Sequence, residues 1–371
     1  MTDERGEWLL RLNAIAFVDA LRAAVLLERL GPRDLAAAPA ARWAQAAGIE
    51  APVAERWRRQ ALEFDADGER RRVAAMGGRV LTRGGADYPE LLDQVPDAPL
   101  ALYALGVLEA KSAVAVVGSR TPTAYGQRMS RHLAGELARR GLAVVSGLAR
   151  GIDAEAHAAA LAAGGATWAV LGSGLAHVYP PENRDLARRI AQGGGALLSE
   201  YPLDQPPAPG NFPRRNRIVA GLAEATVLVE GRRGSGALST AAKAAEYGRE
   251  VLAVPGPADS ALSEAPHRLL REGARLAARV EDVICALPTG AASAPAPVRR
   301  KATPTLAAEE AKVLGLIGAQ SLSLDELSRR SGLDTSRLST IIFGLELKDL
   351  ILAVPGQRYA QKEVRENLQA R

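Results

Sequence analysis

Apolar and polar positions in the middle of the chain follow two alternating periods. Short unbroken apolar runs have the length of buried parallel strands, and segments with helical spacing of apolar residues follow them. The predicted strands are 114–117, 143–146, 167–171, 196–199, 225–229 and 251–254. The predicted helices are 123–140, 153–163, 182–192, 214–222, 237–247 and 266–272. This alternation predicts an α/β architecture, with a Rossmann-like parallel sheet wrapped by helices.

Segments with other patterns flank this sheet. Residues 1–75 have helical periods and resemble a SAM-like or helix-hairpin-helix module, which either contacts nucleic acid or only packs. Residues 76–287 are predicted to form the extended Rossmann-like domain, with the stretch 77–106 on the edge of the main sheet. Residues 288–304 are rich in Ala, Pro and Thr and have no apolar period, which predicts a flexible linker.

The last segment, residues 305–371, has the pattern of a winged helix. Three helical stretches precede a predicted strand pair with Pro355 and Gly356 at its turn. The segment contains nine Lys or Arg and nine Asp or Glu, so it is neutral. Because duplex binding depends on neutralising phosphates, this module is as compatible with a protein contact as with reading DNA.

The composition narrows the class of protein. Arginine accounts for 41 of the 47 cationic residues, and the formal net charge of +5 permits an acidic partner. Genome base composition also explains an arginine excess, so only the positions of individual arginines are evidence. The single cysteine, Cys285, excludes an internal disulfide and a Cys-based zinc site, and a reducing, cytoplasmic setting is expected. No apolar run is long enough to span a membrane, and the charged N-terminus is unlike a secretory signal.

Glycine, serine and arginine recur where the predicted strands end. The strand before Gly118-Ser119-Arg120 runs directly into a helix start, where free backbone N–H groups and a positive helix end would lie beside a guanidinium. Ligands of an open parallel sheet bind beyond the carboxyl ends of its strands, so arginine-bearing loops at one rim predict a groove for a polyanion. The candidate single-stranded DNA-binding residues are Gly118, Ser119, Arg120, Ser146, Gly147, Arg150, Gly151, Asn211, Phe212, Arg214, Arg215, Asn216, Arg217, Ser235, Gly236 and Thr240.

Two residues in these loops have a structural interpretation beside the functional one. Phe212, next to arginines, either stacks on a base of a single strand or anchors its loop in the core. Asp153 is expected to be the N-cap of its helix. The four histidines are scattered without metal-ligand spacing, and no catalytic constellation, metal site or cofactor motif is predicted.

At these residues the chain resembles the DprA/Smf family of DNA-processing proteins. The resemblance lies in many short segments that follow one another in the family's order and cover nearly all of the central domain. They are Val117–Arg120 with Tyr125-Gly126, Ser146–Asp153 with Ala156-His157, Ala169–Gly172, Tyr179–Asn183, Leu198–Pro202, Asn211–Arg217, Ser235–Ala241 and Val254–Gly256.

This resemblance implies a homodimer that binds and protects single-stranded DNA, displaces single-strand-binding protein and loads the RecA recombinase during natural transformation. Carried over to this sequence, Arg120 would hold a phosphate, and Phe212 with the arginines of 214–217 would line the groove. Some members have a lysine three residues before the phenylalanine, where this chain has Pro209. The alternative is a Rossmann-type nucleotide-binding or nucleotide-hydrolysing enzyme. The loop glutamate of the related nucleotide-cleaving enzymes is absent at the matching distance after Gly234. We therefore expect a protein that is not an enzyme.

Overall fold

The computed structural model describes residues 4–16, 18–110, 112–288, 308–317, 321–335, 337–338, 341–342, 345, 350–354 and 358–361. The chain divides into two compact units, Met1–Val298 and Arg299–Arg371. Apart from Pro288, the predicted linker lies outside the described residues. No helix in the described part of the chain is long and apolar enough to cross a membrane.

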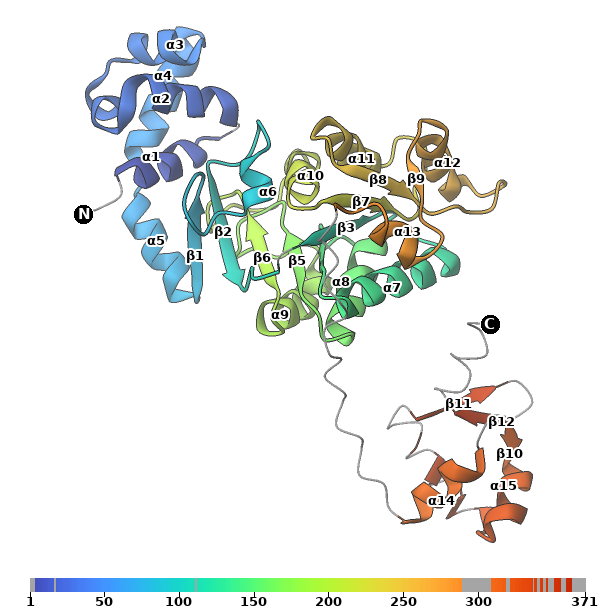
Figure 1. Ribbon diagram of the computed structural model, residues 1–371. Coiled ribbons are helices and arrows are strands. Elements are labelled where there is room, and N and C mark those ends of the chain that lie inside the picture. Colours follow the sequence, from blue (N-terminus) through green and yellow to red (C-terminus); the bar gives the residue numbers. More distant parts are fainter. Residues whose placement is uncertain are drawn as a thin grey trace. The chain divides into compact units, whose positions relative to one another are not determined.

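The first unit is built around a nine-stranded sheet with the order β1-β2-β6-β5-β4-β3-β7-β8-β9 (Figure 1). The strands are β1 Gly78–Thr82, β2 Ala101–Gly106, β3 Ala113–Val117, β4 Ala143–Ser146, β5 Thr167–Val170, β6 Ala196–Ser199, β7 Ala225–Leu228, β8 Glu250–Ala253 and β9 Arg275–Leu276. The seven strands from β6 to β9 along this order are parallel, and β1 and β2 extend the sheet antiparallel at one edge. The predicted Rossmann-like sheet and the edge position of 77–106 are confirmed.

Helices cover both faces of the sheet. The central strand β3 sends Ala115 and Val117 into one core and Val114 and Val116 into the other, as a strand buried on both sides requires. The first core is closed by α6 Glu90–Asp93, α10 Asn211–Gly221, α11 Gly236–Glu246 and α12 Glu264–Arg271. The opposite face carries α7 Ala124–Arg139, α8 Ile152–Ala162, α9 Arg184–Gln192 and α13 Val280–Ile284 (Figure 1).

A helical module precedes the sheet, as predicted. It comprises α1 Glu4–Asn13, α2 Ala20–Ala37, α3 Ala40–Ala47, α4 Ala51–Glu63 and α5 Ala66–Ala75. The predicted break falls inside α2, where Gly31 has a φ of +73° and Pro32 follows. The module has its own core around Trp43, whose ring meets that of Trp8 edge-on at 6.2 Å between centroids.

The second unit has the elements of a winged helix. Its elements are α14 Ala308–Ile317, β10 Leu322–Ser323, α15 Leu324–Ser331, β11 Ile351–Val354 and β12 Arg358–Gln361. Ser323 and Glu326 form a capping box at the start of α15, and helical backbone recurs between Thr335 and Leu345. The three strands form one sheet, with β11 and β12 antiparallel as the predicted wing requires; the turn at Pro355 and Gly356 lies outside the described residues.

Candidate nucleic-acid interface

The order of the strands creates a crevice beside β3. From β3 the chain proceeds through β4, β5 and β6 on one side and then returns to β7 on the other, where Val114 pairs with Ala225. The helices that follow β3 and β7 therefore lie on opposite faces, and their loops separate at the carboxyl edge. Such a reversal of strand order is where open α/β sheets bind ligands. A pocket of about 560 Å³ opens there.

The pocket brings together most of the candidate residues. Those that line it are Gly118, Ser119, Arg120, Gly147, Phe212, Arg215, Asn216, Ser235, Gly236 and Thr240. They come from the loops after β3, β4 and β7 and from the first two turns of α10 and α11. Four arginines line the pocket against a single carboxylate, that of Asp153, so its lining has an excess of positive charge.

Arg120 and Phe212 form the centre of the exposed wall. Arg120 is exposed, and its guanidinium carbon lies 5.9 Å from the centroid of the Phe212 ring. The ring is half-buried because it packs against the backbone after β5, where a Cβ on Gly172 would lie 2.8 Å from Phe212 Cδ1. Phe212 is thus both an anchor of its loop and part of the pocket surface, so the two interpretations of this residue are compatible.

The helix that faces the pocket differs from the one expected. The start of α7 is already engaged, because Thr123 N at the N-cap donates to Glu230 Oε2 at 2.9 Å and Gly126 N in the first turn donates to Thr123 Oγ1. Glu230 is buried and already supplies negative charge at this helix end. By contrast, Gly236 and Ala237 in the first turn of α11 line the pocket, and the N-cap Ser235 makes no side-chain capping bond. The positive helix end available to an anion is therefore that of α11.

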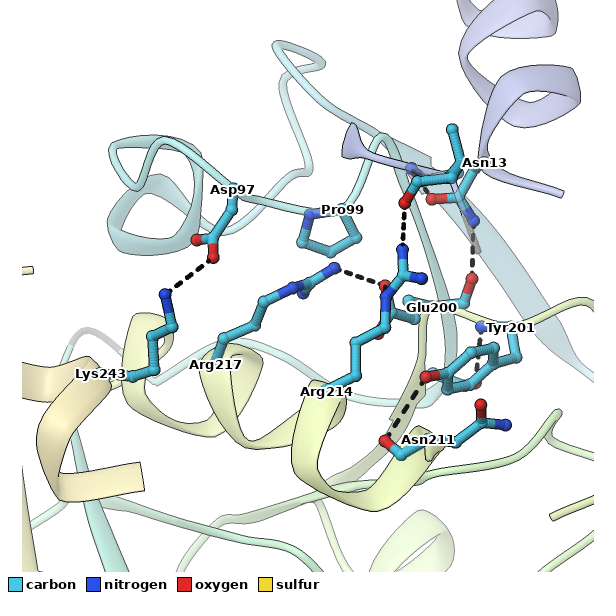
Figure 2. Close-up of polar contacts among 12 residues, drawn as sticks. Asn13, Asp97, Pro99, Glu200, Tyr201, Asn211, Arg214, Arg217 and Lys243 are labelled. Carbon is cyan, nitrogen blue, oxygen red and sulfur yellow. Dashed lines mark hydrogen bonds and ion pairs between the residues drawn. The ribbon is translucent and has the colours of Figure 1, made fainter. Parts of the chain in front are cut away.

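Helix α10 divides the arginines of 214–217 between two faces. The helix was expected to begin at Arg214 but begins at Asn211. In a helix, residues three or four apart share a face, so Phe212, Arg215, Asn216 and Val219 face the pocket together. Arg214 and Arg217 project from another face (Figure 2). The expectation that all these arginines line one groove therefore does not hold.

Arg214 and Arg217 converge on Glu200, the residue after β6 (Figure 2). Arg217 Nη2 donates to Glu200 Oε2 at 2.5 Å, and Arg214 Nε lies 3.6 Å from the same oxygen. Arg214 Nη2 also donates to Val18 O at 2.6 Å, and Asn13 Nδ2 donates to Glu200 O at 2.6 Å. These contacts join α10 to the N-terminal module, so Arg214 and Arg217 connect two parts of the fold.

Arg215 lies in the floor of the pocket. Its side chain is 4% exposed, and Nη1 donates to Gly147 O at 2.6 Å and to Val170 O. Burial lowers the pKa of Arg215, and the nearby Asp153 carboxylate opposes this effect. Burial in turn raises the pKa of Asp153, against the effect of Arg215. Asp153 accepts from Gly147 N and Ala149 N and so holds the loop after β4, while the N-cap of α8 is Gly151.

Four other candidate residues lie outside the pocket lining. Ser146 is fully buried and donates to Val116 O across the sheet, and Asn211 is 7% exposed. Gly151 has a φ of +74° and lets the loop after β4 approach that after β3, where Ile152 N donates to Ser119 O at 3.1 Å. Arg150 is exposed and forms an ion pair with Glu182.

Other residues at the rim were not among the candidates. Arg232 and Arg233 follow β7, line the pocket and are exposed, and their side chains form no ion pair with another described residue. The sequence signal was present, since both lie in the Gly-rich loop after a predicted strand. Tyr179 contacts Phe212, with 5.4 Å between ring centroids. Nothing in the local sequence indicated that contact, because the two residues belong to different loops.

Comparison with known families matches both units of the chain. Residues 79–288 match the model of DNA recombination-mediator protein A, and residues 294–357 match that of the DprA winged helix domain. The protein Smf of Escherichia coli K12 is 42% identical over 275 residues, which cover 72% of this chain and 74% of that protein. The DNA processing protein DprA of Bacillus subtilis is 42% identical over 204 residues, covering 54% of this chain and 68% of the relative.

Solved structures give the same result. The DNA processing protein A of Streptococcus pneumoniae superposes with a TM-score of 0.65 at 31% identity, covering 76% of this chain and 98% of that one. The protein of that name from Helicobacter pylori, for which a single-stranded DNA-binding mode is described, has a TM-score of 0.51 at 30% identity. That match covers 56% of this chain and 94% of the Helicobacter chain.

Proposed function

This chain belongs to the family of DNA recombination-mediator protein A, the DprA/Smf DNA-processing proteins, and on that premise we propose that its pocket binds single-stranded DNA. One arrangement carries the proposal: an exposed guanidinium, Arg120, stands against a half-buried aromatic ring, Phe212, at the reversal of strand order. A phosphate needs the first group and an unpaired base needs the second. Duplex DNA keeps its bases stacked inside, so this pair of groups favours a single strand.

The cations around the pocket are available for phosphates. The side chains of Arg120, Arg232 and Arg233 are exposed and have no carboxylate partner among the described residues. The first turn of α11 adds backbone N–H groups and the positive end of the helix dipole. Arg215 supports the floor from below, where its charge is held by carbonyl groups rather than by an ion pair.

The test is charge reversal at Arg120, with binding of fluorescent oligothymidylate followed by anisotropy. Arg120→Glu should weaken binding by at least about tenfold, since a phosphate contact becomes a repulsion. The plot of log affinity against log salt should become shallower by about 0.7, the value for one phosphate of a single strand.

Arg139→Glu is the matched control. Arg139 ends α7, at the amino edge of the sheet, and is exposed beside Glu136. The Arg139→Glu variant makes the same change of charge and should bind oligothymidylate with nearly wild-type affinity. If Arg139→Glu and Arg120→Glu lose affinity equally, binding depends on total charge and the pocket is not the interface.

We propose further that the pocket holds the strand without cleaving it. Its lining includes one carboxylate, and Asp153 already accepts two backbone N–H groups of the loop after β4. A carboxylate so engaged is poorly placed to activate water. Turnover of oligothymidylate or of a nucleoside monophosphate by pure protein, lost in Asp153→Asn, would refute this part.

The family resemblance extends the proposal to partners. The protein would act as a cytoplasmic homodimer that protects incoming single strands, displaces single-strand-binding protein and loads RecA. Sedimentation of the pure protein tests the dimer. RecA filament formation on strands coated with single-strand-binding protein tests loading, and Arg120→Glu should fail to support it.

A further inference from the structure

Tyr179 is an aromatic side chain exposed at the rim of the pocket. It lies in the loop between β5 and α9 and is 42% exposed, whereas the other large apolar side chains exposed in the described residues are not aromatic. A single exposed apolar residue needs no explanation by itself. Here the ring also contacts that of Phe212, with centroids 5.4 Å apart and planes at 44°. The two rings together form a continuous aromatic surface that extends from Phe212 in the pocket to Tyr179 outside it.

The loop that carries Tyr179 is held in place by one hydrogen bond within the loop and by others to neighbouring segments. Ser173 Oγ donates to His177 O at 2.5 Å, Gly174 N donates to Gln205 O at 2.8 Å, and Ala176 N donates to Leu203 O at 3.1 Å. Beyond the tyrosine, Asn183 Nδ2 donates to Leu148 O at 2.9 Å. A ring on a fixed loop loses little conformational entropy when a ligand stacks on it.

Cations lie at both ends of the aromatic surface. Arg120 approaches Phe212 on the pocket side. At the other end Arg150 pairs with Glu182, two residues beyond Pro180, and both side chains are about half exposed. The hydrogen bond and ion pair with Glu182 raise the pKa of Arg150. Glu182 follows Tyr179 by three residues, and Asn183 joins the same segment to the carbonyl of Leu148, so the loop of Arg150 lies beside the loop of Tyr179. An exposed ion pair contributes little to stability, so a DNA phosphate can replace Glu182.

We propose that Tyr179 is a second base-stacking surface, so that a single strand leaves the pocket over the rings of Phe212 and Tyr179 towards Arg150. This inference rests on the proposed function, because it needs a strand in the pocket. The order along the path is cation, ring, ring, cation, so two consecutive bases would stack on the rings between phosphates that meet Arg120 and Arg150. The surface takes any base, since every base offers a π-face.

The experiment compares Tyr179→Leu with Tyr179→Phe on two probes, a fluorescent dT12 and a 12-mer of abasic residues with the same phosphates. Leucine keeps apolar bulk but removes the ring, whereas phenylalanine keeps it. Tyr179→Leu should bind dT12 about 5- to 150-fold more weakly, the range for loss of one stacked base. It should bind the abasic 12-mer as the wild type does and keep the wild-type salt slope. Tyr179→Phe should match the wild type on both probes.

A further comparison separates stacking from support of Phe212. If Tyr179 stacks on a base itself, Tyr179→Leu should weaken dT12 binding again in a Phe212→Leu background. The inference is overturned if Tyr179→Leu binds dT12 like the wild type, if it weakens both probes equally, or if it adds nothing in the Phe212→Leu background. Each of these results leaves the proposed function intact as long as Arg120→Glu loses affinity. If the wild type fails to bind dT12, the proposed function itself is wrong.

Discussion

Removal of the charge of Glu200 should destabilise the first unit without affecting the DNA pocket. Glu200 is 4% exposed, and its carboxylate faces Arg217, whose side chain is 9% exposed, and Arg214 (Figure 2). Glu200→Gln keeps the shape of the side chain and one acceptor oxygen. It leaves the buried guanidinium of Arg217 without the carboxylate it contacts.

The magnitude follows from the geometry. Two opposite charges 2.5 Å apart attract by roughly 6–7 kcal/mol at an effective dielectric constant of about 20. The amide oxygen of glutamine can still accept a hydrogen bond from Arg217, so the loss of stability is smaller than this attraction. Breaking a buried ion pair from one side costs about 3–5 kcal/mol, and we expect a loss of unfolding free energy in that range.

Urea denaturation followed by tryptophan fluorescence measures this loss in the full chain. All four tryptophans, at positions 8, 43, 57 and 168, belong to the first unit, so the signal reports on that unit alone. Glu182→Gln is the matched control, because it makes the same chemical change in an exposed pair with Arg150 and should leave the unfolding free energy nearly unchanged.

Two results would refute the reasoning. One is a loss for Glu200→Gln no larger than that for Glu182→Gln, which would mean that the pair is solvated. The other is a folded Glu200→Gln protein that no longer binds oligothymidylate, which would place Arg214 and Arg217 in the interface. A Glu200→Met, Arg217→Met double variant should recover most of the stability, since apolar side chains of similar volume replace both charges.

Two further predictions concern stability. His157 is buried, and desolvation together with Arg215 lowers its pKa to about 3, so below the unfolded pKa of about 6.5 only the unfolded state takes up its proton. Stability should therefore fall by about 2 kcal/mol from pH 7 to pH 5, and His157→Gln should lack this part of the loss in parallel urea titrations. Gly126→Ala should cost about 1–3 kcal/mol, because the added Cβ would clash with the Glu230 carboxylate that caps α7. An unchanged urea midpoint would contradict that assignment of Glu230.

The strands were predictable because their signal is local. Strands β4 and β6 begin and end at the predicted residues, since parallel strands buried on both faces are unbroken apolar runs between turn residues. The position of the pocket followed from a general rule for such sheets, together with glycines and arginines after the strands. Phe212 and Arg120 were expected at one rim, and the structure brings them together there.

The rest of the site depends on contacts between distant parts of the chain. Glu230 closes the start of α7 from the end of β7, and no pattern around Thr123 indicates that partner. The turn that starts α10 three residues early decides which arginines reach the pocket, since one residue of helix rotates a side chain by about 100°. Arg214 and Arg217 pair with Glu200, and Asn13 of the N-terminal module contacts the carbonyl of Glu200, only once both parts are folded.

The most direct test of the central claim is a crystal structure of the protein with a short oligothymidylate. The account predicts a phosphate within hydrogen-bonding distance of Arg120, a base against Phe212 and no DNA contact from Arg217. A strand bound on another surface, with the pocket at the ends of β3 and β7 free of nucleotide, would contradict it.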